Sequence, residues 1–128
     1  MIKHYIDIDG FWGIVFCYNY SQEDELEMAG IMDSFGLDNE SIADAIEVLS
    51  CPNTGMTISR SDITMSVIFV SRATSKAQFM DTITHEVDHA QYAIERHYYV
   101  ACGTEDAAWL QGYIMRGITR ALEKDGVI

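Results

Sequence analysis

Apolar and polar positions alternate along some segments of the chain and repeat every three to four residues along others, which separates predicted strands from predicted helices. Four short segments have the aromatic and β-branched content or the alternation that is typical of strands: residues 2–8, 11–20, 56–59 and 65–71. Asp9 and Gly10 separate the first two segments, and Ser61 and Asp62 separate the last two. Each pair is therefore predicted to form a hairpin.

Helical spacing fills the stretch between the two hairpins. A first helix is predicted to begin at Ser21, with Asp24 three residues later as its capping partner, and to end at Gly36. The apolar side of this helix consists of Leu26, Ile31, Met32 and Phe35. A second helix is predicted over residues 39–49.

The strongest helical pattern follows the second hairpin. Ser75 and Gln78 have the spacing of a capping box, which satisfies exposed backbone N–H groups at a helix start. On a helical wheel with Phe79 at zero, a stripe between about 20° and 80° predicts the side that packs against a core, and it consists of Ile83, Val87, Ala90 and Ile94. A last helix, capped by Thr104, is predicted to run to Lys124 on the apolar positions Ala108, Trp109, Tyr113, Ile114, Ile118 and Leu122.

Composition and element order predict one α+β domain over residues 1–128, with a small antiparallel or mixed sheet packed against the last two helices. The chain has 48% hydrophobic residues and one proline, which is enough apolar material for a core. Its longest apolar runs are too short for a membrane span, and residues 1–10 lack the pattern of a signal peptide, so a cytoplasmic protein is expected. The three cysteines lack paired spacing and are predicted to be reduced thiols.

The net charge of −12 limits which classes of partner are expected to bind. An acidic protein repels phosphate backbones, so nucleic acid is not expected to bind. Many acidic residues fall in the first two predicted helices, where they are expected to face water. Alternatively, their field attracts a basic substrate or partner.

Residues 85–89 read His-Glu-Val-Asp-His, which is the H-E-x-x-H pattern of zinc hydrolases, and they lie in the third predicted helix. Four residues turn a helix by about 400° and raise it by about 6 Å, so His85 and His89 share a face and can bind one zinc ion. Glu86 points about 100° away from His85, beside the ion, where a carboxylate can act as general base and acid. Both histidines lie off the predicted core stripe and Glu86 lies at its boundary, which is typical of a cleft wall.

A catalytic zinc ion takes three protein ligands, so a third residue has to join the two histidines. Glu95 and His97 are poor candidates, because a continuous helix carries them about 15 Å and about 18 Å beyond His85 along its axis. Glu105 is the better candidate, because it opens the last predicted helix beside two small alanines that allow a close approach to the motif helix. Asp106 remains the alternative, and the helix dipole alone also explains an acidic residue at either position.

With these residues the chain resembles the gluzincins, metallopeptidases with H-E-x-x-H on one helix and a glutamate on a second. It is more closely similar to short zincin-like proteins of bacterial and phage genomes, in which an Asn- and Gly-containing turn, a hairpin, a capped helix and a Glu-x-x-Ala-Tyr-Leu segment follow one another. The matching residues are Asn53 to Gly55, Val67 to Ser71, Ser75, His85-Glu86-x-x-His89 and Glu105-x-x-Ala108-Trp109-Leu110, with Trp109 where tyrosine is usual. The resemblance covers roughly residues 53–118 and implies a zincin-like fold with His85, His89 and Glu105 as zinc ligands and Glu86 as the catalytic acid and base.

These patterns predict a zinc-dependent metallopeptidase that hydrolyses peptide bonds with metal-activated water. The residues available to stabilise the oxyanion are Tyr92, His97, Tyr98, Tyr99 and Tyr113, and the sequence does not choose among them. The strand at residues 65–71 is expected to present an edge to which an extended peptide adds. The alternative prediction is a zinc-stabilised, phage-associated binding or assembly module with vestigial or narrowly regulatory peptidase activity.

Overall fold

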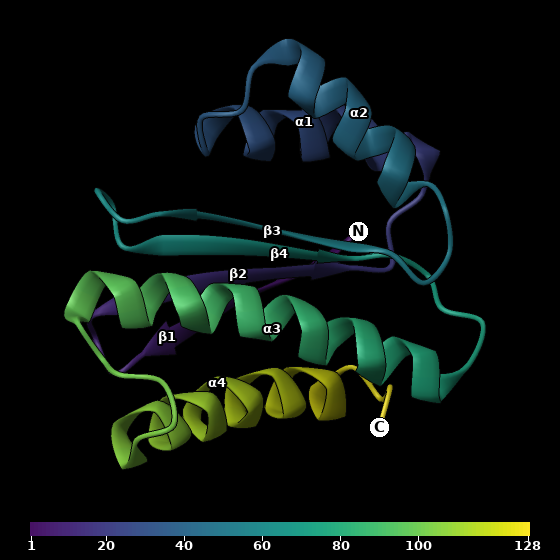
Figure 1. Ribbon diagram of the computed structural model, residues 1–128. Coiled ribbons are helices and arrows are strands. Elements are labelled where there is room, and N and C mark those ends of the chain that lie inside the picture. The colour runs from purple at the N-terminus through teal and green to yellow at the C-terminus, as the bar shows by residue number, and fades with distance from the viewer.

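The computed structural model describes residues 1–128 and has the predicted α+β class, with a four-stranded mixed sheet between two layers of helices (Figure 1). The strands are β1 (Ile2–Ile8), β2 (Trp12–Tyr18), β3 (Gly55–Arg60) and β4 (Met65–Val70). The α-helices are α1 (Glu25–Ser34), α2 (Asn39–Leu49), α3 (Lys76–Tyr98) and α4 (Glu105–Lys124), and a short 3-10 turn η1 (Gln22–Asp24) precedes α1. None of these helices has the length and apolar content needed to cross a membrane.

The strand order is β1-β2-β4-β3. Both predicted hairpins are confirmed, because β1 pairs antiparallel with β2 and β3 pairs antiparallel with β4. The central pair, β2 and β4, is parallel, because the chain crosses through α1 and α2 before it returns as the second hairpin. The prediction that the strand at residues 65–71 presents an edge was wrong: β4 is paired on both sides, and β3 is the free edge.

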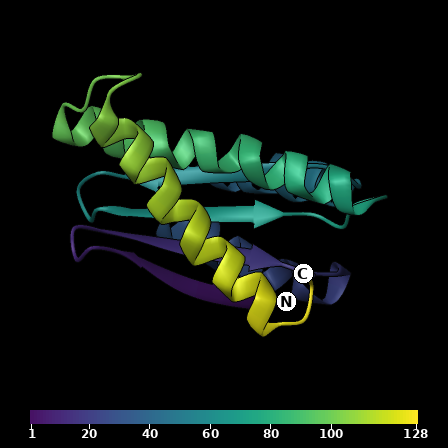
Figure 2. The same ribbon diagram turned by 90° about the horizontal axis from the view of Figure 1, so that it is seen from below.

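Helices cover both faces of the sheet. In Figure 1, α1 and α2 lie above the strands, and α3 and α4 lie below them. Figure 2 shows α3 along β3 and β4, with α4 crossing obliquely over the β1 side. Strands buried on both faces carry continuous apolar runs, which accounts for β4, where Val67 and Phe69 pack under α1 and α2 while Ile68 and Val70 pack under α3 and α4.

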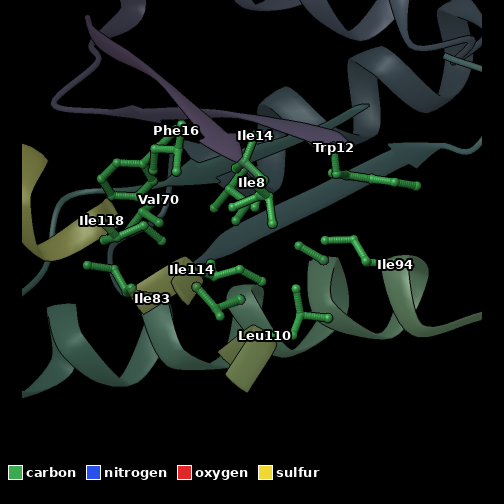
Figure 3. Close-up of a cluster of buried hydrophobic side chains, with 14 of the residues drawn as sticks. Ile8, Trp12, Ile14, Phe16, Val70, Ile83, Ile94, Leu110, Ile114 and Ile118 are labelled. Carbon is green, nitrogen blue, oxygen red and sulfur yellow. The ribbon is translucent and has the colours of Figure 1, made fainter. Parts of the chain in front are cut away.

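The larger core lies between the sheet and the last two helices. Figure 3 shows Ile8, Trp12, Ile14, Phe16 and Val70 of the sheet facing Ile83 and Ile94 of α3 and Leu110, Ile114 and Ile118 of α4. The stripe predicted for α3 is confirmed, since all four of its residues are buried. Ser75 also caps α3 as predicted, because its Oγ accepts the N–H of Gln78 at 3.1 Å.

Two predicted apolar faces needed correction. In α1, Met32 of the predicted side is buried, but Leu26 is 87% exposed and Met28, one turn before Met32, is buried in its place. In α4, Trp109 is half-exposed, and Ala107 and Leu110 begin the buried stripe. Apolar residues are spread around α1, so hydrophobicity alone did not fix which of its sides is buried, whereas in α4 Trp109 stands beside a well-defined buried stripe.

Candidate metal centre

The two histidines of the motif converge on the outer flank of α3. His85 and His89 are exposed, and their Nε2 atoms lie 3.2 Å apart, with the rings tilted edge to face. Two imidazole nitrogens bound to one tetrahedral zinc ion at 2.0–2.1 Å lie about 3.3 Å from each other. The observed separation therefore fits a shared zinc ion.

Glu86 is turned inward from the histidines and is only 5% exposed. The hydroxyl of Thr57 on β3 lies 2.9 Å from Glu86 Oε1 and 3.0 Å from the backbone oxygen of Glu86, so it can donate to either oxygen. The second carboxylate oxygen, Oε2, lies 3.9 Å from His85 Nε2. One oxygen is therefore anchored on the sheet, and the other is directed toward the histidine pair.

The partners of Glu86 are compatible with a cation beside it. A buried carboxylate is costly unless a positive charge or a set of donors compensates it. No lysine or arginine pairs with Glu86, and Thr57 is the one side chain that donates to it. A metal ion held by His85 and His89 would supply the missing positive charge beside Oε2.

Close packing of β3 against α3 creates this arrangement. Gly55 opens β3 directly against Glu86, and a Cβ at this position would lie 2.7 Å from Glu86 Cγ and 3.0 Å from Glu86 Oε2. Gly55 was predicted only as part of a turn, and Thr57 only as part of a strand. A glycine at the start of a strand can mark a close approach of another backbone or side chain. Gly55 was therefore the feature of the sequence from which this contact could have been predicted.

A pocket of about 310 Å³ opens beside His85 and Glu86. Its other lining residues are Val48, Asn53, Thr54, Gly55, Asp81 and Thr82. Asp81 precedes His85 by four residues and so lies one helical turn away on a similar face. Asp81 was not among the predicted site residues, although its spacing from His85 repeats that of the two histidines.

The structure does not bring Glu105 to the histidines. The Gln91 side chain on α3 donates to the backbone oxygen of Ala107 on α4 at 3.2 Å, which places α4 against the flank of Gln91. That flank is about 120–160° around α3 from the two histidines.

The side chains of α4 agree with this placement. Glu105 lies at the exposed start of the helix, about 160° from Ala107 and about 140° from Leu110 on the wheel. Asp106 lines a different pocket, with Trp109 and Leu110. No three His, Cys, Asp or Glu residues lie close enough together to hold one ion, so the role of Glu105 or Asp106 as third ligand stays a prediction.

The residues considered for the oxyanion are dispersed. Tyr98 donates its hydroxyl to the backbone oxygen of Phe11 at 2.8 Å, and His97 packs edge to face against Trp12. Tyr99 is the left-handed residue that ends α3, and Tyr113 lies on α4 beside Trp109.

Tyr92 is the one member of this set on the flank of the histidines. It follows His89 by three residues, which leaves it about 60° around α3 from His89. Its ring is 59% exposed and lies under the guanidinium of Arg96. The assignment of an oxyanion donor therefore stays a prediction.

No protein-family model, no curated protein and no solved structure matches this chain. The geometry of His85, Glu86 and His89 is therefore the basis on which a function is proposed.

Proposed function

We propose that the protein is a zincin-like, zinc-dependent metallopeptidase that acts in the cytosol on peptide or protein substrates. The observation that carries the proposal is the convergence of His85 and His89, with Nε2 atoms 3.2 Å apart, beside the buried carboxylate of Glu86, which pairs with no lysine or arginine. This set of donors matches the nitrogen ligands that zinc prefers and the carboxylate base that zinc hydrolases place next to the ion.

The residues have separate roles in this proposal. His85 and His89 hold the ion, which when bound lowers the pKa of a coordinated water to about 7 and polarises a substrate carbonyl. Glu86 takes the proton of the attacking water on Oε2 and returns it to the leaving amine. Thr57 keeps Oε1 hydrogen-bonded, which fixes the direction of Oε2.

The free edge of β3 supports a peptide as the substrate. The N–H of Ser71 donates to the oxygen of Thr54 at 2.9 Å, so the backbone groups of Thr54 face β4. Strand alternation then directs the backbone groups of Gly55, Thr57 and Ser59 outward to the unpaired edge. An extended peptide paired with this edge passes the histidine pair, because Gly55 and Thr57 contact Glu86.

Two residues are candidates for the third zinc ligand. Glu105 is supported by the resemblance to gluzincins and requires α4 to present a different face from the one it presents here. Asp106 is the alternative that the sequence leaves open, and it lines a different pocket here. Zinc affinity of the Glu105→Gln and Asp106→Asn variants separates them, because loss of a ligand weakens zinc binding and loss of a distant carboxylate does not.

Hydrolysis of a fluorogenic peptide library by the zinc-loaded protein tests the function. The Glu86→Gln variant is expected to bind zinc and to have lost hydrolysis, whereas the control Glu95→Gln, on α3 beyond the motif, keeps both. Hydrolysis that persists in Glu86→Gln, or a zinc-loaded wild-type protein that cleaves nothing, contradicts the proposal. In the second case, zinc-dependent thermal stability without hydrolysis favours the zinc-stabilised binding module.

A further inference from the structure

A second pocket lies at the other end of the β3 and α3 pair. It has a volume of about 330 Å³ and is lined by Trp12, Ser59, Ser61, Ala93, Arg96 and His97. The chain has 20 acidic and 8 basic residues, yet no acidic side chain lines this pocket. Its local charge is therefore opposite in sign to that of the protein.

A buried hydrogen-bond chain leaves Ser59 as a donor. Trp12 donates its indole N–H to Ser66 Oγ at 3.0 Å, and Ser66 Oγ lies 2.6 Å from Ser59 Oγ. Ser66 is fully buried, and Ser59 is the one acceptor within reach of its hydroxyl hydrogen. Since buried hydroxyl groups are satisfied in folded proteins, Ser66 donates to Ser59, and the hydroxyl hydrogen of Ser59 is free to bind a ligand.

Arg96 adds a charged donor to the same pocket. It takes part in none of the ion pairs of the protein, and its guanidinium lies over the ring of Tyr92, 5.6 Å from the centroid. The planar fork of N–H groups is therefore available to an incoming acceptor. With Ser59 and Arg96 as donors and no acidic lining residue, the pocket is suited to an anion.

The pocket is aligned with the histidine pair. Arg96 follows His89 by seven residues, which is close to two helical turns, so both side chains leave the same flank of α3 about 10 Å apart along the axis. On β3, Gly55 contacts Glu86 and Ser59 lines the pocket. An extended peptide covers about 10 Å with three residues.

We propose that this pocket binds a carboxylate side chain of the peptide substrate, about three residues from the bond that lies at the histidine pair. The identity of the ligand as a peptide rests on the proposed peptidase function. The planar carboxylate accepts two hydrogen bonds from the Arg96 fork and a third from the Ser59 hydroxyl. The preferred substrate is then acidic at one position, although the protein itself is acidic.

The test uses zinc-loaded protein and a set of peptides in which a single Glu is moved through successive positions, each with a matched Gln peptide. One position is expected to favour Glu over Gln by about tenfold in kcat/KM, as a charge-assisted hydrogen bond predicts. In Arg96→Gln this ratio falls below about twofold, because the bond to the charged donor is lost. The control Arg116→Gln, which removes an arginine stacked on Tyr113 of α4, keeps the ratio.

Equilibrium binding of the same peptides separates the failure of this inference from the failure of the proposed function. Hydrolysis without a Glu preference at any position, or a preference that survives Arg96→Gln, overturns the carboxylate site and leaves the peptidase intact. If no peptide is cleaved, tighter binding of one Glu peptide that is lost in Arg96→Gln supports the carboxylate site alone. Equal binding of every Glu and Gln pair overturns it.

Discussion

Replacement of Gly55 by alanine is expected to destabilise the protein, because the new methyl group collides with α3. The added Cβ would lie 2.7 Å from Glu86 Cγ and 2.9 Å from Thr82 Cγ2. Carbon atoms in ordinary contact are about 3.5–4.0 Å apart, so β3 and α3 have to separate by about 1 Å. Both obstructing side chains belong to α3, so a shift of this one helix has to relieve both contacts. The cost of overpacking is therefore in the upper part of its usual range, at about 2–3 kcal/mol.

Part of this cost is offset in the unfolded chain. Alanine has less backbone freedom than glycine in the unfolded chain, so it loses less conformational entropy on folding, which stabilises the folded state by about 0.5–1 kcal/mol. The net loss of unfolding free energy is then about 1–2.5 kcal/mol, and Tm falls by about 4–9 °C in a chain of this size.

Urea unfolding followed by far-UV circular dichroism measures the effect. A matched control is Gly112→Ala in α4, where a Cβ meets nothing within 4 Å and where alanine stabilises a helix by up to about 1 kcal/mol. The two substitutions are therefore expected to change the unfolding free energy in opposite directions. A Gly55→Ala variant as stable as the wild-type protein would refute the close approach of β3 to Glu86.

Three further predictions concern Thr57 and the cysteines. Thr57→Val removes the hydroxyl donor of the buried Glu86 carboxylate and is expected to cost about 1.5–3 kcal/mol in urea unfolding, whereas Thr57→Ser keeps the donor; equal stability of the two variants counts against the hydrogen bond. Cys51 and Cys102 are exposed and are expected to react with a thiol reagent at pH 8, whereas Cys17 reacts only after unfolding. Burial raises the pKa of Cys17 to about 12 in the folded protein. The thiol of the unfolded chain therefore loses its proton at a lower pH than the thiol of the folded chain. The stability contributed by Cys17 is lost as the pH rises from about 9 toward 12. A Cys17→Ala variant with the same alkaline decline as the wild-type protein contradicts that linkage.

Local patterns were sufficient to predict most of the elements. The alternation in residues 2–8, the apolar run within residues 65–71 and the capping residues Ser75 and Thr104 are all local features, and the structure places strands and helix starts there. The positions of His85 and His89 relative to the core also follow from helix geometry alone, since the buried stripe of α3 is on its other side.

Contacts between distant segments were not accessible in the same way. The insertion of β4 between β2 and β3 depends on the crossover through α1 and α2, which no local period encodes. Trp109 was expected in the core because tryptophan is large and apolar, yet the neighbouring Ala107 and Leu110 pack there. The resulting orientation of α4 also determines where Glu105 points, which is why the third ligand could not be decided from the sequence.

The support of Glu86 by β3 was missed for a related reason. Gly55 and Thr57 are ordinary residues in a strand pattern, and their importance appears only when β3 lies against α3. A motif identifies the residues that carry the chemistry, but the residues that orient them come from whichever element packs alongside.

Zinc stoichiometry shows whether His85 and His89 hold a zinc ion next to Glu86. Titration of metal-free protein against a chromophoric zinc chelator is expected to give one tightly bound ion per chain in the wild-type protein and in Glu86→Gln. The same titration is expected to show no tight site in His89→Ala. Wild-type protein that fails to compete with the chelator, or His89→Ala that binds zinc as tightly as the wild-type protein, would contradict the account.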